Sequence, residues 1–241
     1  MKNFILALDC SLRWTNAAVF EDGEVLASER LDIGRRQAAE LPLVVERVLK
    51  ETNRSFKDIG LVAVTNGPGY FTGIRVGASY AAALAYGLGV KVAPVSTLRM
   101  LAYPYTGKSK SRPVLALVYA GKGRVYAASF GCAQYGNTEL PPGEYGGDQL
   151  GAWLQENPEE ILLVSDDPEK AAETSGLTSR EILLSPADAA VVAAIAAQML
   201  EASYADSRSN DSIQSIAFPA AFPIVSPMEL KIFYHRNPQV G

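Results

Sequence analysis

The chain has 241 residues, of which 48% are hydrophobic and 20% charged, and its net charge of −4 is compatible with one large or two modest globular domains. An acidic chain is a poor stand-alone nucleic-acid binder, and the longest uncharged run, residues 76–90, is shorter than the ~20 apolar residues of a membrane span. Two cysteines in no metal-ligand spacing and a single histidine, His235, exclude a disulfide framework and a metal site built on a histidine pair, so a soluble cytoplasmic protein is expected.

The N-terminal segment predicts three strands in a meander. Residues 4–9 form a short apolar run that ends in Asp9. The next two extended runs, 15–21 and 24–31, flank Asp22-Gly23, a dipeptide that is a strong signal for a tight hairpin. We therefore expect an antiparallel meander with Asp9 at the end of its first strand.

Helical and extended patterns alternate after the meander. Apolar residues recur at helical spacing over residues 40–52 and predict an amphipathic helix, with Pro42 tolerated in its first turn. The elements expected next are a buried strand over 60–65, a helix over 72–88, a strand over 90–95 and a short helix over 97–103. A meander followed by such alternation predicts an α/β fold in which helices flank a mixed sheet.

The polar loop 106–112 is the expected boundary between two lobes. The elements expected beyond it are a hairpin over 113–119 and 124–132, a helix over 148–157, a strand over 161–165 and an Ala-rich helix over 187–202 capped by Ser185. The Pro-rich remainder predicts an extended or partly disordered tail, and no internal repeat is evident. The expected division is a first lobe over 1–104, a second, reduced lobe over 105–215 and a tail over 216–241.

The segment TNGPGYFTGIRVG, residues 65–77, raises the question of a phosphate-binding loop. It lacks the lysine of a Walker loop, its third glycine comes one residue late for a dinucleotide loop, and Pro68 removes a backbone amide. Gly67 and Gly69 permit positive φ angles, and Thr72 is suited to cap the following helix. The segment therefore favours a structural corner, and weak anion binding by its free amides stays open.

The two helices predicted over 74–88 and 187–202 are nearly free of charge. The first carries only Arg75, and the second carries two acidic residues among alanines and larger apolar residues. A helix that is apolar on every side must be covered on every side, and one sheet covers only one face. The remaining cover has to come from the other lobe of this chain or from another protein, and both alternatives are open.

The first part of the chain resembles one protein family. The features that carry the resemblance are the strand ending in Asp9, the meander, the segment GPGYFTGIRVG at 67–77 leading into an Ala-rich helix, and VSTL at 95–98. Over residues 3–104 these features are similar to the TsaB (YeaZ) family, the non-catalytic paralogues of the TsaD/Kae1 proteins within the ASKHA superfamily of actin-like ATPases. The resemblance implies two tandem RNase-H-like lobes.

The resemblance also implies a role in tRNA modification, the formation of threonylcarbamoyladenosine (t6A) at adenosine 37. It implies a TsaD-like partner that performs the transfer, a TsaE-like ATPase that joins the complex, and a homodimer when the chain is alone. The chain itself would be a scaffold or activator with no catalytic residue and no cofactor. The metal-binding histidines of TsaD, the basis of older glycoprotease or peptidase M22 labels, are absent here. No sequence-specific nucleic-acid contact and no membrane are expected.

A partner interface is expected on the nearly charge-free helix after Gly73 and on the helix over 40–52 beside it. The residues predicted to form it are Leu41, Val45, Tyr70, Phe71, Thr72, Arg75, Ala78 and Ala82. Aromatic residues and arginine are common at interface hot spots, which is why the first turn of the helix would frame the contact.

Two enzymatic alternatives remain. The first is an active ASKHA-type ATPase or small-molecule kinase in which Asp9 positions Mg²⁺, with Ser11, Gly67 and Gly69 as further cofactor-binding candidates. The loop after Asp9 lacks the Gly-Thr phosphate loop of such kinases, which favours a vestigial strand-end carboxylate over a metal anchor at Asp9. Weak binding of ATP or ADP at a subunit interface stays open. The second is a protease, which would need a base beside Ser11 or Ser96, and the chain has no suitably placed histidine.

Overall fold

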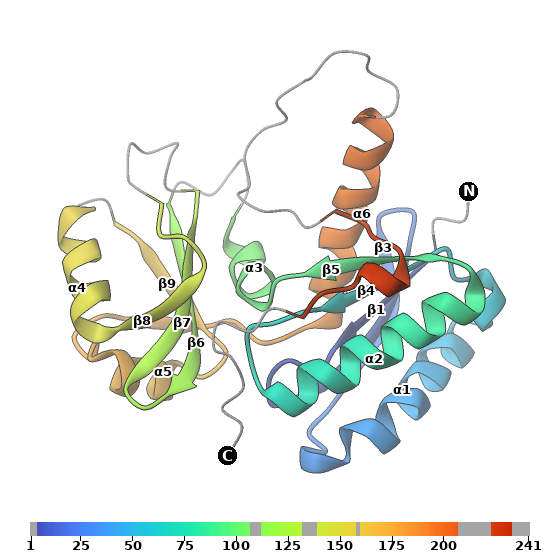
Figure 1. The fold of residues 1–241 in the computed structure, drawn as a ribbon, viewed down its shortest axis with the longest axis horizontal. Coiled ribbons are helices and arrows are strands. Elements are labelled where there is room, and N and C mark those ends of the chain that lie inside the picture. The colour runs from blue at the N-terminus through green and yellow to red at the C-terminus, as the bar shows by residue number, and fades with distance from the viewer. Residues whose placement is uncertain (1–3, 107–111, 132–138, 158–159, 207–222, 233–241) are drawn as a thin grey trace. The chain divides into compact units, whose positions relative to one another are not determined.

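The structure is a computed structural model that describes residues 4–106, 112–131, 139–157, 160–206 and 223–232. The chain forms two compact units (Figure 1). Of the described residues, the first unit comprises 4–96, 188–206 and 223–232, and the second comprises 97–106, 112–131, 139–157 and 160–187. Within the described residues, no helix is both long enough and apolar enough to cross a membrane.

A five-stranded mixed sheet forms the centre of the first unit. Its strands are β1 (Ile5–Asp9), β2 (Thr15–Glu21), β3 (Glu24–Leu31), β4 (Leu61–Thr65) and β5 (Lys91–Val95), in the order β3-β2-β1-β4-β5. The first three are antiparallel, whereas β4 and β5 run parallel to β1. Positive φ angles at Asp22 and Gly23 close the β2–β3 hairpin, so the predicted meander is confirmed.

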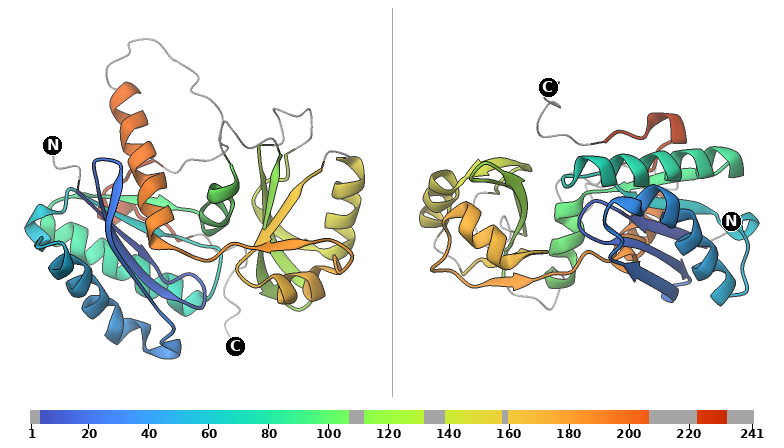
Figure 2. Two further views of the ribbon diagram at one scale, coloured as in Figure 1. Left: turned by 180° about the vertical axis from the view of Figure 1, so that it is seen from behind. Right: turned by 90° about the horizontal axis from the view of Figure 1, so that it is seen from below.

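Helices cover both faces of this sheet (Figures 1 and 2). The helices are α1 (Gln37–Glu51), α2 (Phe71–Leu88) and α6 (Ala189–Asp206), with short 3-10 helices η1 (Gly34–Arg36), η2 (Phe56–Asp58) and η5 (Pro227–Glu229). Helices α1 and α2 pack on one face, and α6 crosses the other. Every residue of β1 and β4 is buried, as expected of strands covered on both sides.

The second unit repeats the same strand order. Its strands are β6 (Val114–Gly121), β7 (Arg124–Phe130), β8 (Gly143–Gly146), β9 (Leu162–Ser165) and β10 (Ile182–Leu184), in the order β10-β9-β6-β7-β8. Its helices are α3 (Thr97–Ala102), η3 (Tyr103–Tyr105), α4 (Gly147–Glu156) and α5 (Pro168–Ser175). As in the first unit, three antiparallel strands are followed by two that run parallel to the first. The two units therefore share one topology, as expected of two tandem RNase-H-like lobes.

The boundaries of the units differ from the predicted lobes. Helix α6 lay in the predicted second lobe, 105–215, but it packs on β1 and β2 of the first unit. Residues 223–232 of the predicted tail also belong to the first unit, where the backbone of Val225 exchanges hydrogen bonds of 2.9 and 2.8 Å with Val92. Most of the predicted boundary loop, residues 106–112, lies outside the described residues.

Two predicted helix caps are wrong. The N-cap of α2 is Tyr70, because the helix begins at Phe71, and Thr72, the predicted cap, lies inside the first turn. Near the start of α6, the Asp188 carboxylate accepts a hydrogen bond from the Ala190 N–H at 2.8 Å. Ser185 instead donates its hydroxyl to the Leu101 carbonyl at 2.7 Å. Elements β8, α5 and β10 were not predicted because each is short and weakly patterned.

Candidate functional site

Asp9 ends β1 and is completely buried. Its Oδ1 accepts hydrogen bonds from the Ser11 N–H at 3.0 Å, the Ser11 hydroxyl at 2.6 Å and the Thr65 hydroxyl at 2.6 Å, and its Oδ2 accepts one from the Asn16 amide at 3.1 Å. Thr65 is near because β4 runs parallel to β1 and ends at the same edge of the sheet. Burial raises the pKa of Asp9, and the hydrogen bonds from Ser11, Thr65 and Asn16 oppose that rise.

The Gly-Pro-Gly segment packs directly against the turn that follows Asp9. A Cβ atom on Gly69 would lie 2.1 Å from the Ser11 carbonyl oxygen, and one on Gly73 would lie 2.0 Å from the Cys10 carbonyl oxygen. The same Ser11 carbonyl accepts the Tyr70 N–H at 2.7 Å. The segment is therefore a corner whose glycines allow two backbone segments to touch, as the sequence favoured.

Three of the predicted cofactor-binding residues thus come together, but as a closed packing arrangement. Asp9, Ser11 and Gly69 meet at one edge of the sheet, and Gly67 is buried in the same corner segment. Three hydrogen bonds end on Oδ1 of Asp9 and one ends on Oδ2, so this fully buried carboxylate is engaged by protein donors on both oxygens and is not presented to a Mg²⁺ ion from solution. In the part of the chain that the structure describes, no group of three histidine, cysteine or acidic residues could hold a metal ion. These residues do not fit a Mg²⁺–nucleotide complex.

Helix α2 has one buried and one outward face. Its buried residues are Gly73, Ile74, Gly77, Ala78, Ala81 and Ala85. Ala78 is only 3% exposed, and Leu41 and Val45 of α1 are fully buried in the core of the first unit. These three residues, expected at a partner interface, are therefore core residues of this chain. Ala82 is half-buried at the border of the two faces.

The outward face of α2 begins with aromatic residues and continues with small ones. Tyr70, Phe71, Thr72 and Arg75 are exposed, as an interface requires, and the Arg75 guanidinium lies 5.1 Å from the centre of the Phe71 ring. The face continues through three exposed residues, Ser79, Ala83 and Tyr86. Arg75 is its only charge, and Tyr86, near the end of the helix, is 72% exposed.

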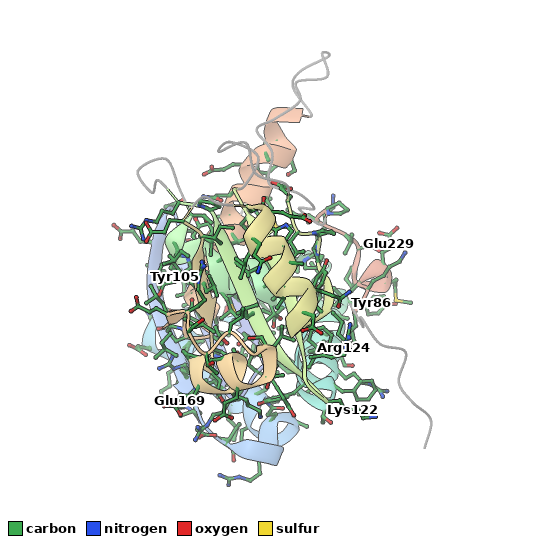
Figure 3. The ribbon with its side chains drawn as sticks, turned by 90° about the vertical axis from the view of Figure 1, so that its left-hand side faces the viewer. Tyr86, Tyr105, Lys122, Arg124, Glu169 and Glu229 are labelled. Carbon is green, nitrogen blue, oxygen red and sulfur yellow. The ribbon has the colours of Figure 1, made fainter. Side chains whose placement is uncertain are left out.

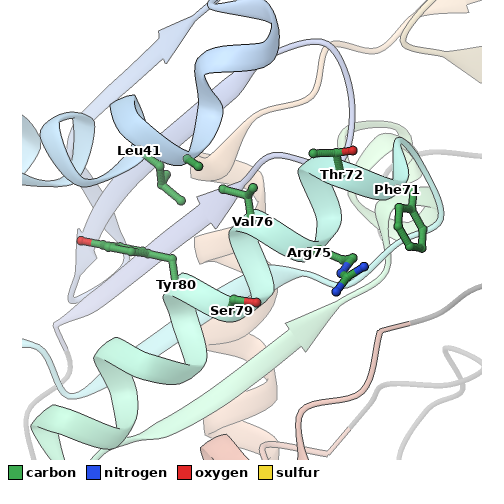
Figure 4. A pocket seen from close by; sticks show the side chains of 8 residues that line it. Leu41, Phe71, Thr72, Arg75, Val76, Ser79 and Tyr80 are labelled. Carbon is green, nitrogen blue, oxygen red and sulfur yellow. The ribbon is translucent and has the colours of Figure 1, made fainter.

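A shallow groove of about 520 Å³ runs between this face and α1 (Figure 4). Leu41 and Val76 face each other from the two helices at its floor, while Thr72 and Ser79 line it from α2. The groove is therefore lined by uncharged side chains, apart from Arg75.

The C-terminal segment covers another flank of α2, which the sequence did not reveal. Val225 and Leu230 pack on the core cluster of the first unit, and the Asn66 amide donates to the Lys231 carbonyl at 3.2 Å. Helix η5, which carries Glu229, contacts α2, which carries Tyr86 (both residues are labelled in Figure 3). Part of the cover that α2 needs thus comes from the chain's own tail, whose proline-rich sequence has no period that predicts packing.

Sequence comparisons identify the relatives of this chain. The family model described as TsaD, tRNA N6-adenosine threonylcarbamoyltransferase, matches residues 32–221. The Escherichia coli protein described as tRNA threonylcarbamoyladenosine biosynthesis protein TsaB is 32% identical over 172 residues, which cover 71% of this chain and 68% of that protein. A protein with the same description from Buchnera aphidicola is 30% identical over 130 residues, which cover 54% of this chain and 58% of that protein.

Solved structures share the fold. YeaZ from Pseudomonas aeruginosa has a TM-score of 0.64 at 21% identity, covering 96% of this chain and 99% of that chain. A second structure from this organism, described as an uncharacterized protein with similarity to peptidase YeaZ, has a TM-score of 0.65 at 19% identity, covering 97% of this chain and 100% of that chain. The sequence matches span 58% and 68% of the two curated relatives. By its family-model match and its identity to the Escherichia coli relative, the chain belongs to the TsaB (YeaZ) family.

Proposed function

We propose that this chain is a non-catalytic subunit that pairs with a TsaD-like paralogue in the cytoplasm for t6A formation at adenosine 37 of tRNA. Family membership supports the pathway, since curated relatives are described as t6A biosynthesis proteins. The observation that carries the pairing is the outward face of α2, which is exposed and uncharged except for Arg75. The chain's own core and tail cover only the other sides of this helix.

The composition of this face suits a helix from another protein. Alanine and serine at positions 79, 82 and 83 let a second helix approach closely, because their side chains are short. Phe71 and Tyr86 supply large exposed aromatic surfaces near the two ends of the face. Depletion of charge at the centre with aromatic residues and arginine around it is typical of interface cores.

A homodimer would use the same face. An isologous contact places one surface patch against its own copy, so a second chain and a paralogue of the same fold would compete for α2. We propose that the chain alone dimerises in this way and exchanges its copy for the TsaD-like partner. A TsaE-like ATPase would then join the assembled pair.

The kinase or ATPase alternative has no observation in its favour. Asp9 already holds four hydrogen bonds, and Gly69 lies against the turn where a phosphate would have to enter. His235, the single histidine of the chain, lies outside the described residues. The proposal therefore leaves the transfer reaction to the partner and assigns no catalytic residue and no cofactor to this chain.

A matched pair of substitutions tests the pairing. Ala83→Glu places a charge on the outward face of α2, whereas Ala202→Glu makes the same change at an exposed position of α6, on the other side of the sheet. Burying an unpaired charge at an interface costs about 3 kcal/mol or more, which corresponds to roughly a hundredfold weaker association. Co-elution with a TsaD-like paralogue should be lost for Ala83→Glu and retained for Ala202→Glu.

Reconstitution tests the role itself. Paralogue, TsaE-like ATPase, tRNA and threonylcarbamoyl-adenylate are combined with the wild-type chain, with Ala83→Glu or without the chain. Modified tRNA should form with the wild-type chain, and its yield should be reduced to a similar extent in the other two reactions. An unchanged yield without the chain would refute the proposed function, and wild-type co-elution of Ala83→Glu would place the interface elsewhere.

A further inference from the structure

A tryptophan stacked with two arginines lies on the first unit, at the turn between β1 and β2. The Arg30 guanidinium lies 4.8 Å from the centre of the Trp14 ring, and the Arg13 guanidinium lies 5.5 Å from it. The pairing of Thr15 with Leu31 brings the end of β3 beside this turn, which is how residues far apart in the sequence meet. The Arg13 side chain is 68% exposed, Arg30 is exposed and Trp14 is half-buried.

The cluster itself holds two cations in a chain that is acidic as a whole. These are Arg13 and Arg30, and Glu29, next to Arg30 in the sequence, is engaged by Arg47 at 2.8 Å, whereas the whole chain has a net charge of −4. Asp32 pairs with Arg13 at 2.6 Å, and Glu40 pairs with Arg36 at 3.6 Å. Among the described residues no carboxylate forms an ion pair with Arg30. Its guanidinium is held by the indole ring while its N–H donors are available at the edge.

This chemistry fits a polyanion with planar bases better than it fits a protein surface. A guanidinium stacked on an aromatic ring presents N–H donors in the geometry that phosphate oxygens and base edges accept. A protein interface needs an apolar core, and the exposed large apolar residues of the first unit lie elsewhere, at Val25, Leu26, Leu43, Tyr70, Phe71, Tyr86 and Met228. Trp14 is the one large apolar side chain of the cluster, as is usual where a base stacks.

We propose that the cluster of Arg13, Trp14 and Arg30 contacts RNA through phosphates and an unpaired base, without sequence specificity. This inference rests on the proposed function, in which the substrate of the assembled complex is a tRNA. The cluster is small, so it adds affinity to a complex that already holds the tRNA and does not make this acidic chain an RNA binder by itself.

Charge reversal on the two opposite edge strands of the first sheet provides the test. Arg30→Glu changes the cluster, and Lys91→Glu makes an equal change in charge at the exposed first residue of β5, at the opposite edge of the sheet. The affinity of the complex of this chain with its TsaD-like paralogue is measured for an unmodified tRNA transcript between about 50 and 200 mM salt. Over this range a protein with several phosphate contacts loses about a thousandfold or more in affinity for nucleic acid. Arg30→Lys, which keeps the charge but loses the planar group, is the third variant.

We expect Arg30→Glu to weaken tRNA binding about tenfold at low salt and to reduce the salt slope by about one, with Arg30→Lys in between and Lys91→Glu within about twofold of wild type. Equal effects of Arg30→Glu and Lys91→Glu, or no effect of either, would overturn the inference. Loss of co-elution with the paralogue in Arg30→Glu would overturn it too, since the cluster would then be a protein contact. Binding of each variant to the paralogue is measured as well. A variant that binds the paralogue normally but shows no change in tRNA affinity would therefore refute this inference and leave the proposed pairing through α2 intact.

Discussion

Gly73 and Gly87 lie in the same helix, and the structure predicts opposite effects of replacing each by alanine. A Cβ on Gly73 would lie 2.0 Å from the Cys10 carbonyl oxygen and 3.0 Å from Oε1 of Gln37. The nearer atom belongs to the backbone of the turn after β1 and cannot rotate away. A Cβ on Gly87 would have no heavy atom within 4 Å.

The magnitudes follow from two competing terms. Replacing glycine by alanine inside a helix stabilises it by about 0.5–1 kcal/mol, because the unfolded chain loses freedom. At Gly87 this is the whole effect, reduced to roughly 0.5 kcal/mol since the residue lies in the last turn. At Gly73 the backbone must open by more than an ångström, and overpacking of this kind costs about 1–3 kcal/mol or more. We expect Gly73→Ala to lose about 2 kcal/mol, so the two variants differ by roughly 2–3 kcal/mol.

Urea unfolding followed by far-ultraviolet circular dichroism measures both variants against wild type. The transition of the first unit is the relevant one, because α2 belongs to it. If Gly73→Ala is as stable as Gly87→Ala, the helix does not lie against the Cys10 carbonyl, and the description of a closed corner beside Asp9 would be refuted. That result would also reopen the question of an anion site at this segment.

Two further predictions concern the tail and the buried carboxylate. Val225→Pro removes the N–H that bonds to the Val92 carbonyl at 2.8 Å and should lower the free energy of unfolding by about 1–3 kcal/mol. Met228→Ala, at a residue that is 83% exposed, should change the free energy of unfolding by less than about 0.5 kcal/mol. Equal effects of the two substitutions in urea unfolding would contradict the docked tail. Because burial raises the pKa of Asp9 above 3.8, the folded state holds this proton more tightly than the unfolded state. The stability of wild type relative to Asp9→Asn should therefore decrease as pH rises from 3.8 through the raised pKa, and urea titrations over this window that gave a flat or rising difference would contradict the buried, desolvated carboxylate.

The sequence by itself determined the local elements and the nature of the glycine-rich corner. The hairpin at Asp22-Gly23, the amphipathic α1 and the strands of the first sheet are all encoded within a few residues, by turn preferences and by periodicities of two or 3.6. The same local chemistry, a missing lysine and an amide removed by Pro68, ruled against a phosphate loop before any packing was known. The family motif lies in this well-determined part of the chain.

Only the tertiary structure decided how the nearly charge-free helices are covered. An apolar helix has no amphipathic stripe that indicates its buried side, so the sequence could not tell that Ala78 is core and Ala83 is exposed. The assignment of α6 to the first sheet and the docking of Val225 on β5 likewise depend on contacts between residues more than a hundred positions apart. The stacking of Arg30 on Trp14 arises from strand register. Such long-range contacts leave no periodic signal in the chain, because they are selected by the packing of the whole unit rather than by local conformation.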